Sequence, residues 1–130
     1  MRVWLCSSRR DTGHELVALG CEGEMSTRGF FGIGIENGKH VPNLGVLWRS
    51  AHVFGADFIF TVAHRYQRQP SDTMKTWRHV PLFQYESFDA LFAALPKDSR
   101  LVGVEQCAGA RELGRFHHPD RAIYLLGGED

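Results

Sequence analysis

Residues 43–62 read NLGVLWRSAHVFGADFIFTV and place a helical pattern directly before a strand-sized apolar run. In the helical part, apolar residues recur three and four positions apart, at Leu44, Leu47, Trp48, Ala51 and Phe54. Asn43 stands where an N-cap would begin the helix, and Gly55 stands in the usual stop position. The pattern therefore predicts a helix over about residues 44–54, followed by a strand at Phe58–Val62.

Further apolar runs of strand length lie on both sides of this stretch. They occupy residues 30–35, 81–85, 101–104 and 122–126. Between two of them, Ser87 can cap a second helix that carries Phe88, Leu91, Phe92 and Leu95, and Pro96 can end it. Continuous apolar runs separated by helices are typical of parallel strands that are covered on both faces. We therefore expect an α/β fold with a mostly parallel sheet flanked by helices.

Length, composition and cysteine content exclude several classes of protein. The chain has 130 residues, 43% of them hydrophobic, and 15 basic residues balance 15 acidic ones, which suits one globular domain. The three cysteines contain no CxxC pair, and the histidines have no ligand spacing, so we expect neither a disulfide framework nor a metal site. No apolar run approaches the roughly 20 residues of a membrane span, and no secretion signal is visible. A cytoplasmic protein without a membrane partner is expected.

Residues 1–24 differ in composition from the rest, because they are rich in Ser, Gly, Arg and Glu and have little apolar sequence. We expect a poorly ordered N-terminal extension over 1–24 and a globular domain over 25–130, with Met25 as a natural start. The arginines at the beginning could contact nucleic acid, but acidic residues in the same segment oppose that interpretation.

One segment, residues 64–80 (HRYQRQPSDTMKTWRHV), concentrates positive charge and aromatic rings. Arginine and lysine suit phosphates, and tyrosine or tryptophan can stack on unpaired bases. The candidate RNA-binding residues in this segment are Arg65, Arg68, Lys75, Trp77 and Arg78. A solvated loop anchored by one aromatic side chain explains the same residues equally well.

Arg49 is the unusual residue of the first helix, because it projects nearly opposite the apolar stripe and is flanked by Val46 and Val53. Either another element or subunit covers this second face, or Arg49 is a surface side chain that lies over two valines. The glycines at 32 and 34 form no GxGxxG motif; inside a strand they mark a close approach of the backbone or a bulge.

Two short motifs stand out between about Gly32 and Asp130. The first consists of Asn43, Leu44, Gly45, then Arg49, Ser50, Ala51, and then Phe54, Gly55. The second consists of Leu125, Leu126, Gly127, Gly128, Glu129. In their order and separation the two motifs make this part of the chain resemble the SpoU (TrmH-type) RNA methyltransferases of the SPOUT superfamily.

The resemblance implies a SPOUT-like α/β knot fold, S-adenosylmethionine (SAM) as methyl donor, a ribose 2'-hydroxyl of tRNA or rRNA as acceptor, and a homodimer. It places Arg49, with Asn43 beside it, at the transfer site. It places Gly127, Gly128 and Glu129 around the cofactor. Because arginine stays protonated in proteins, we assign Arg49 to orienting the 2'-hydroxyl and its phosphate, and leave open the family's proposal that it removes the proton.

The family's third motif, a Ser-Leu-Asn segment beyond motif two, has no counterpart before Asp130. We therefore expect the knot-forming C-terminal segment to be missing, by truncation, and the enzyme to be impaired. A catalytically silent RNA-binding α/β module is the alternative function.

Overall fold

The computed structural model describes residues 2–5, 29–36, 41–63, 73–106, 108 and 110–127. A sheet in the order β4-β3-β2-β7-β5-β1-β6 forms its centre. The strands are β1 Arg2–Leu5, β2 Phe30–Glu36, β3 Phe58–Val62, β4 Leu82–Tyr85, β5 Arg100–Val104, β6 Arg111–Glu112 and β7 Arg121–Leu126. The helices are α1 Val41–Val53 and α2 Phe88–Ala94, and the short 3-10 helices are η1 Thr76–Arg78 and η2 Leu113–Arg115.

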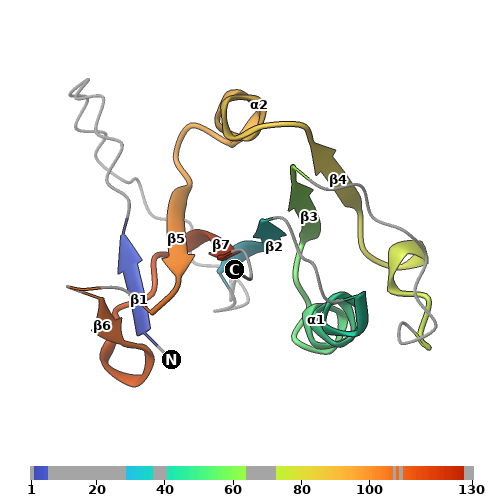
Figure 1. Ribbon diagram of the computed structural model, residues 1–130, viewed down its shortest axis with the longest axis horizontal. Helices are drawn as coiled ribbons and strands as arrows, with labels where there is room; N and C mark the ends of the chain where they lie inside the picture. Colours follow the sequence, from blue (N-terminus) through green and yellow to red (C-terminus); the bar gives the residue numbers. More distant parts are fainter. Residues whose placement is uncertain are drawn as a thin grey trace, which may run out of the picture.

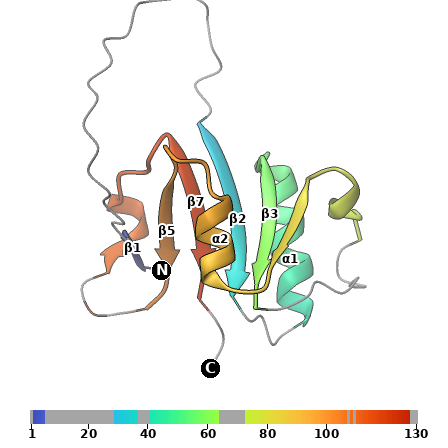
Figure 2. The ribbon, with the colours of Figure 1, turned by 90° about the horizontal axis from the view of Figure 1, so that it is seen from above.

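The five strands β4, β3, β2, β7 and β5 are neighbours in this order and are all parallel. They correspond to the five apolar runs of the sequence, so the predicted α/β fold with a mostly parallel sheet is confirmed. β2 lies in the middle, where Gly34 is level with Phe60 of β3 and Leu125 of β7. Figure 2 shows β5, β7, β2 and β3 side by side.

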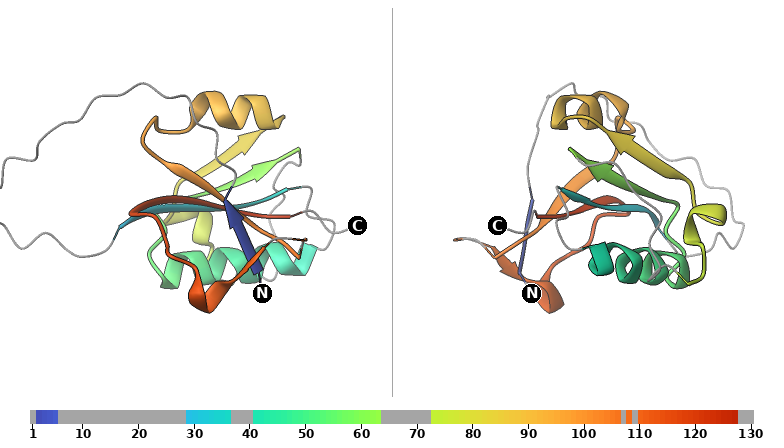
Figure 3. Two further views of the ribbon diagram at one scale, coloured as in Figure 1. Left: turned by 90° about the vertical axis from the view of Figure 1, so that its left-hand side faces the viewer. Right: turned by 45° about the vertical axis from the view of Figure 1, so that its right-hand side comes forward.

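The two helices cover opposite faces of the sheet, with α2 on one side and α1 on the other (Figures 1 and 3). α1 packs its fully buried Leu44 and Trp48 on Ile35 and Ile59. On the other face Leu91 of α2 belongs to a cluster of buried side chains that also contains Phe58, Phe60, Val62, Leu101, Ile123 and Leu125. Because each fully buried large apolar side chain contributes about 1.5–3 kcal/mol, these two layers hold the helices on the sheet.

The two glycines of β2 make room for aromatic rings of β3. A Cβ at Gly32 would overlap the ring of Phe58, and a Cβ at Gly34 would overlap both the ring and the backbone oxygen of Phe60. The interpretation of these strand glycines as points of close approach is confirmed, because each leaves space for an aromatic ring of the neighbouring strand.

α1 begins at Val41, so the prediction that Asn43 is the N-cap was wrong. Asn43 lies inside the first turn. The physical reason is Pro42, whose fixed φ and missing N–H suit the first turn of a helix and allow it to start earlier.

The C-terminal end of α1 and the start of α2 agree with the sequence signals. After α1, Gly55 has a φ of 70°, the Gly55 N–H donates to the His52 oxygen at 3.1 Å, and the Ala56 N–H donates to the Ala51 oxygen at 2.8 Å. These are the two bonds of a Schellman motif, in which glycine avoids left-handed strain. At the start of α2 the Ser87 hydroxyl accepts from the Ala90 N–H at 3.2 Å, as predicted.

Strand β1 was not expected. Arg2–Leu5 pairs antiparallel with β5, with Trp4 level with Gly103, and also pairs with β6. These four residues form a strand although the sequence predicted an extension there, because the open edge of β5 offers backbone N–H and C=O groups to a further strand. Residues 6–24 and the predicted boundary at 25 lie outside the described residues.

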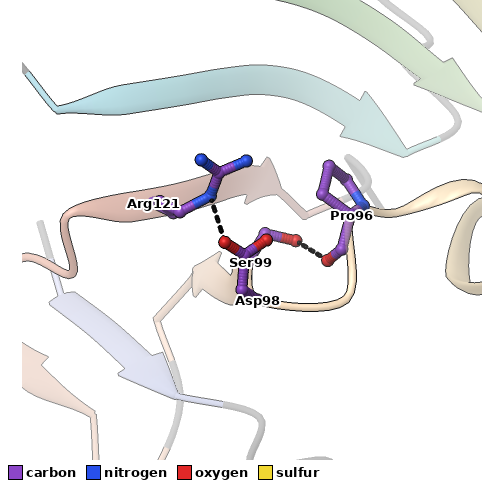
Figure 4. A network of polar contacts seen from close by, with 4 residues as sticks. All are labelled: Pro96, Asp98, Ser99 and Arg121. Atoms are coloured by element: carbon purple, nitrogen blue, oxygen red, sulfur yellow. Dashed lines mark hydrogen bonds and ion pairs between the residues drawn. The ribbon is translucent and has the colours of Figure 1, made fainter. Parts of the chain in front are cut away.

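Side chains fasten the amino ends of the parallel strands. The Phe31 N–H at the start of β2 donates to Asp57 Oδ2 at 2.8 Å. Arg121, the first residue of β7, places Nε 2.9 Å from Asp98 Oδ2 in the loop before β5, and next to it the Ser99 hydroxyl donates to the Pro96 oxygen at 2.7 Å (Figure 4). The Arg121 guanidinium also lies 4.9 Å from the centre of the Phe30 ring.

Candidate functional site

The carboxyl ends of β2, β7 and β5 meet at one edge of the sheet, because the three strands are parallel neighbours. The register aligns Leu126 of β7 with Ile35 of β2 and with Val104 of β5. α1 follows β2 after a short connection, so its first turn, with the exposed Asn43, starts from this same edge. Ligands of open parallel sheets bind at the carboxyl ends of the strands, which makes this edge the candidate cofactor site.

Gly127 directly follows β7, and its backbone is in close contact with a side chain from the segment after β5. A Cβ at Gly127 would overlap Oε2 of Glu105, which is the residue that directly follows β5. The other carboxylate oxygen, Oε1, accepts from the Gln106 N–H at 2.7 Å. Gly127 itself donates a long bond of 3.4 Å to the Val104 oxygen. A side chain here would have to displace the exposed Glu105 carboxylate, and with glycine motif two presents its backbone at this position.

Glu105 was missed in the sequence because no motif contains it. A usable signal was its position, since it is the first polar residue after a buried parallel strand, at the edge where ligands bind. The other two predicted cofactor residues, Gly128 and Glu129, lie outside the described residues.

Arg49 is half-buried and lies in the third turn of α1. Because α1 runs back from the carboxyl edge, Arg49 is about 12 Å along the helix axis from Val41. Of the two valines that flank it, Val46 is 50% exposed and Val53 is 70% exposed, so both keep a large part of their surface open to solvent.

Arg49 shares a flank of α1 with His52, since residues three apart on a helix are neighbours. The His52 ring stacks on the ring of His79, with 5.1 Å between centres and 28° between planes. His79 directly follows η1, so this flank of α1 faces the described end of the basic segment. The fold thus gathers Arg49 and residues 75–79 on one side of the molecule.

In that part of the basic segment Lys75 and Arg78 are exposed and Trp77 is half-buried. The Arg78 guanidinium carbon lies 4.9 Å from the centre of the Trp77 ring, a cation–π contact that holds a planar cation at the surface. Two exposed cations beside an aromatic ring suit a phosphate backbone and a stacked base. The other predicted RNA contacts, Arg65 and Arg68, lie outside the described residues.

Among the described residues, no group of three or more His, Cys, Asp or Glu side chains is arranged to hold a metal ion. None of the described helices has both the length and the apolarity needed to cross a membrane. Burial raises the pKa of Tyr85 and of Tyr124, and the Tyr124 hydroxyl also lies 2.6 Å from His118 Nδ1.

Comparison with known proteins agrees with the two sequence motifs, one in α1 and the other at the end of β7. The SpoU rRNA methylase family matches residues 31–130, from β2 to the last residue of the chain. Neither the curated proteins nor the solved structures yield a significant match. The match covers well over half of the chain and contains both Arg49 and Gly127. The chain therefore belongs to the SpoU rRNA methylase family, a family of RNA methyltransferases.

Proposed function

We propose that this protein is a SAM-dependent methyltransferase that modifies a ribose 2'-hydroxyl of tRNA or rRNA in the cytoplasm. The observation that carries the proposal is that Gly127 directly follows β7, at the edge of the sheet from which α1 starts, in a chain of an RNA methyltransferase family. The 2'-hydroxyl as acceptor would also let the protein distinguish RNA from DNA.

The residues present fit such a cofactor. Because Gly127 carries no side chain, a bound molecule can come close to its backbone, beside the exposed carboxylate of Glu105. A carboxylate at the same place can accept hydrogen bonds from ammonium or hydroxyl groups. Together with Gly128 and Glu129, Gly127 would hold SAM, and bound SAM supplies an electrophilic methyl group.

The residues on the flank of α1 would hold the RNA. Lys75 and Arg78 would bind phosphates, and Arg78 with Trp77 would present a flat surface to a base. Arg49 would donate hydrogen bonds to the acceptor nucleotide and orient its 2'-hydroxyl, because a fixed guanidinium stays charged and cannot readily take a proton. Arg65 and Arg68 would extend the same surface.

The protein would act as a homodimer. Arg49 lies on a helix face whose Val46 and Val53 are exposed, and Phe54 at the end of the same helix is 73% exposed. A second subunit on this face would cover these side chains and bring Arg49 into a shared site. Sedimentation of the 130-residue chain tests this, with a monomer at all concentrations as the contrary result.

The decisive experiment is transfer of a labelled methyl group from SAM to unmodified tRNA and rRNA. We expect the product to contain a nucleotide that resists alkaline cleavage at its 3' side, and no transfer to DNA of the same sequence. Arg49→Ala should lower the rate by about a hundredfold, the order of effect expected when a reacting group is no longer positioned. Arg111→Ala is the matched control, since Arg111 is exposed on β6 at the far edge of the sheet.

Each other outcome has a definite meaning. Transfer that persists in Arg49→Ala would contradict the role given to Arg49. RNA binding that weakens with salt, without any SAM binding, would contradict the enzyme and support a catalytically silent RNA-binding module. Methylation on a base instead of the ribose would contradict the acceptor but retain the enzyme.

A further inference from the structure

The carboxylate of Glu105 lies at the candidate cofactor edge. Its Oε1 accepts from the Gln106 N–H at 2.7 Å. Its Oε2 lies against the Gly127 backbone, in the volume that a side chain would otherwise fill. Glu105 is an exposed residue, so its carboxylate can meet a molecule bound at Gly127.

We propose that Glu105 is a cofactor-positioning residue, whose Oε2 accepts a hydrogen bond from an N–H or O–H donor of SAM seated on Gly127. This inference rests on the proposed function, because it takes SAM as the molecule bound there. The glycine then helps in two ways, since it brings the backbone close to SAM and leaves space for the carboxylate.

The chemistry of SAM offers two donors for a carboxylate. One is the α-ammonium group of its amino-acid part, and the other is a ribose hydroxyl of its nucleoside part. In either case the bond is charge-assisted and stronger than a bond between neutral groups. 5'-Methylthioadenosine keeps the ribose and lacks the ammonium group, so it separates the two sources.

The experiment is calorimetric titration of SAM and of 5'-methylthioadenosine into the 130-residue chain and its variants. Glu105→Gln keeps the size of the side chain and removes the charge, and Glu105→Asp keeps the charge and shortens the reach. Glu86→Gln is the matched control, since Glu86 is exposed and directly follows β4, three strands away from β7 at the same edge. Thermal unfolding of each variant checks that the fold is intact.

We expect Glu105→Gln to weaken SAM binding roughly tenfold, as for a lost bond to a charged group, with Glu105→Asp in between and Glu86→Gln unchanged. Weakening for SAM alone would identify the ammonium group as the donor, and weakening for both compounds the ribose. Equal SAM binding by the unaltered chain and by Glu105→Gln would overturn the inference and leave the proposed function standing. Absence of SAM binding by the unaltered chain would overturn the cofactor part of the proposed function, and this inference with it.

Discussion

At the amino edge of the parallel sheet, side chains bond to neighbouring segments, whereas at the carboxyl edge a carboxylate rests on the backbone of a glycine. Asp57 accepts from the start of β2, and Asp98 pairs with the start of β7. At the other edge Glu105 and Gly127 meet in the volume of an absent side chain. We infer that one edge of this sheet holds the strands together and that the other offers an exposed carboxylate beside a glycine for binding.

Asp57→Ala, at the amino edge, should cause the largest loss of stability. Removing the carboxylate leaves the Phe31 N–H without its acceptor, so the free energy of unfolding should fall by about 2 kcal/mol, as for other hydrogen bonds to charged groups. Thermal unfolding should show a midpoint lower by roughly 5–10 °C. Asp57→Asn keeps an oxygen acceptor and should lose less. A loss of SAM binding free energy that exceeds the loss of unfolding free energy would contradict the proposed division between the two edges.

Gly127→Ala should instead lower SAM affinity and leave the stability nearly unchanged. Its Cβ would displace the Glu105 carboxylate, a flexible exposed group, so the stability should change by less than about 1 kcal/mol. SAM affinity should fall about tenfold, equivalent to about 1.4 kcal/mol, measured by calorimetric titration. Gly114→Ala is the control, since a Cβ there meets nothing within 4 Å. Unchanged SAM affinity in Gly127→Ala would count against a cofactor on this loop.

A smaller effect is expected for Arg121→Ala at the amino edge. The variant loses the ion pair with Asp98 and the contact over the Phe30 ring, both of which are partly exposed to solvent. Such contacts contribute about 0.5–1 kcal/mol each at most, so the urea midpoint should move only slightly and SAM binding should not change. A loss comparable to that of Asp57→Ala would show that Arg121 is a principal fastening of this edge.

The smallest effect concerns alkaline pH. Burial raises the pKa of Tyr124, so the folded state favours the neutral phenol. The stabilising contribution is complete below the unfolded pKa of about 10 and is lost as the pH rises through the higher folded value. Unfolding measured between pH 9 and 11 should show stability falling, and Tyr124→Phe should reduce that fall. An identical pH profile in Tyr124→Phe would contradict this origin.

Much of the fold was predictable because its signals are local. The five apolar runs and the patterns of α1 and α2 mark the parallel strands and the helices. Gly55 stops α1 and Ser87 caps α2, through bonds to residues a few positions away. The predicted start of α1 is too late because Asn43 is a good N-cap residue, whereas Pro42 next to it favours the first turn and the helix begins at Val41.

The candidate site was predictable only where a motif carries it. Gly127 came from motif two, and the structure places it at the carboxyl edge. Glu105 belongs to no motif, and its contact with Gly127 depends on the pairing of β5 with β7. β1 was missed for a related reason, since its pairing depends on the open edge of β5, far away in the sequence.

Short-range patterns in the sequence encode the α/β class, the main strands and helices, and the family motifs. Tertiary contacts set the strand order, the stacking of His52 on His79, and the placement of Glu105 on Gly127. Those features join segments that are distant along the chain. Their geometry follows from the register of β5 with β7 and from the packing of α1 on the sheet, which no local pattern specifies.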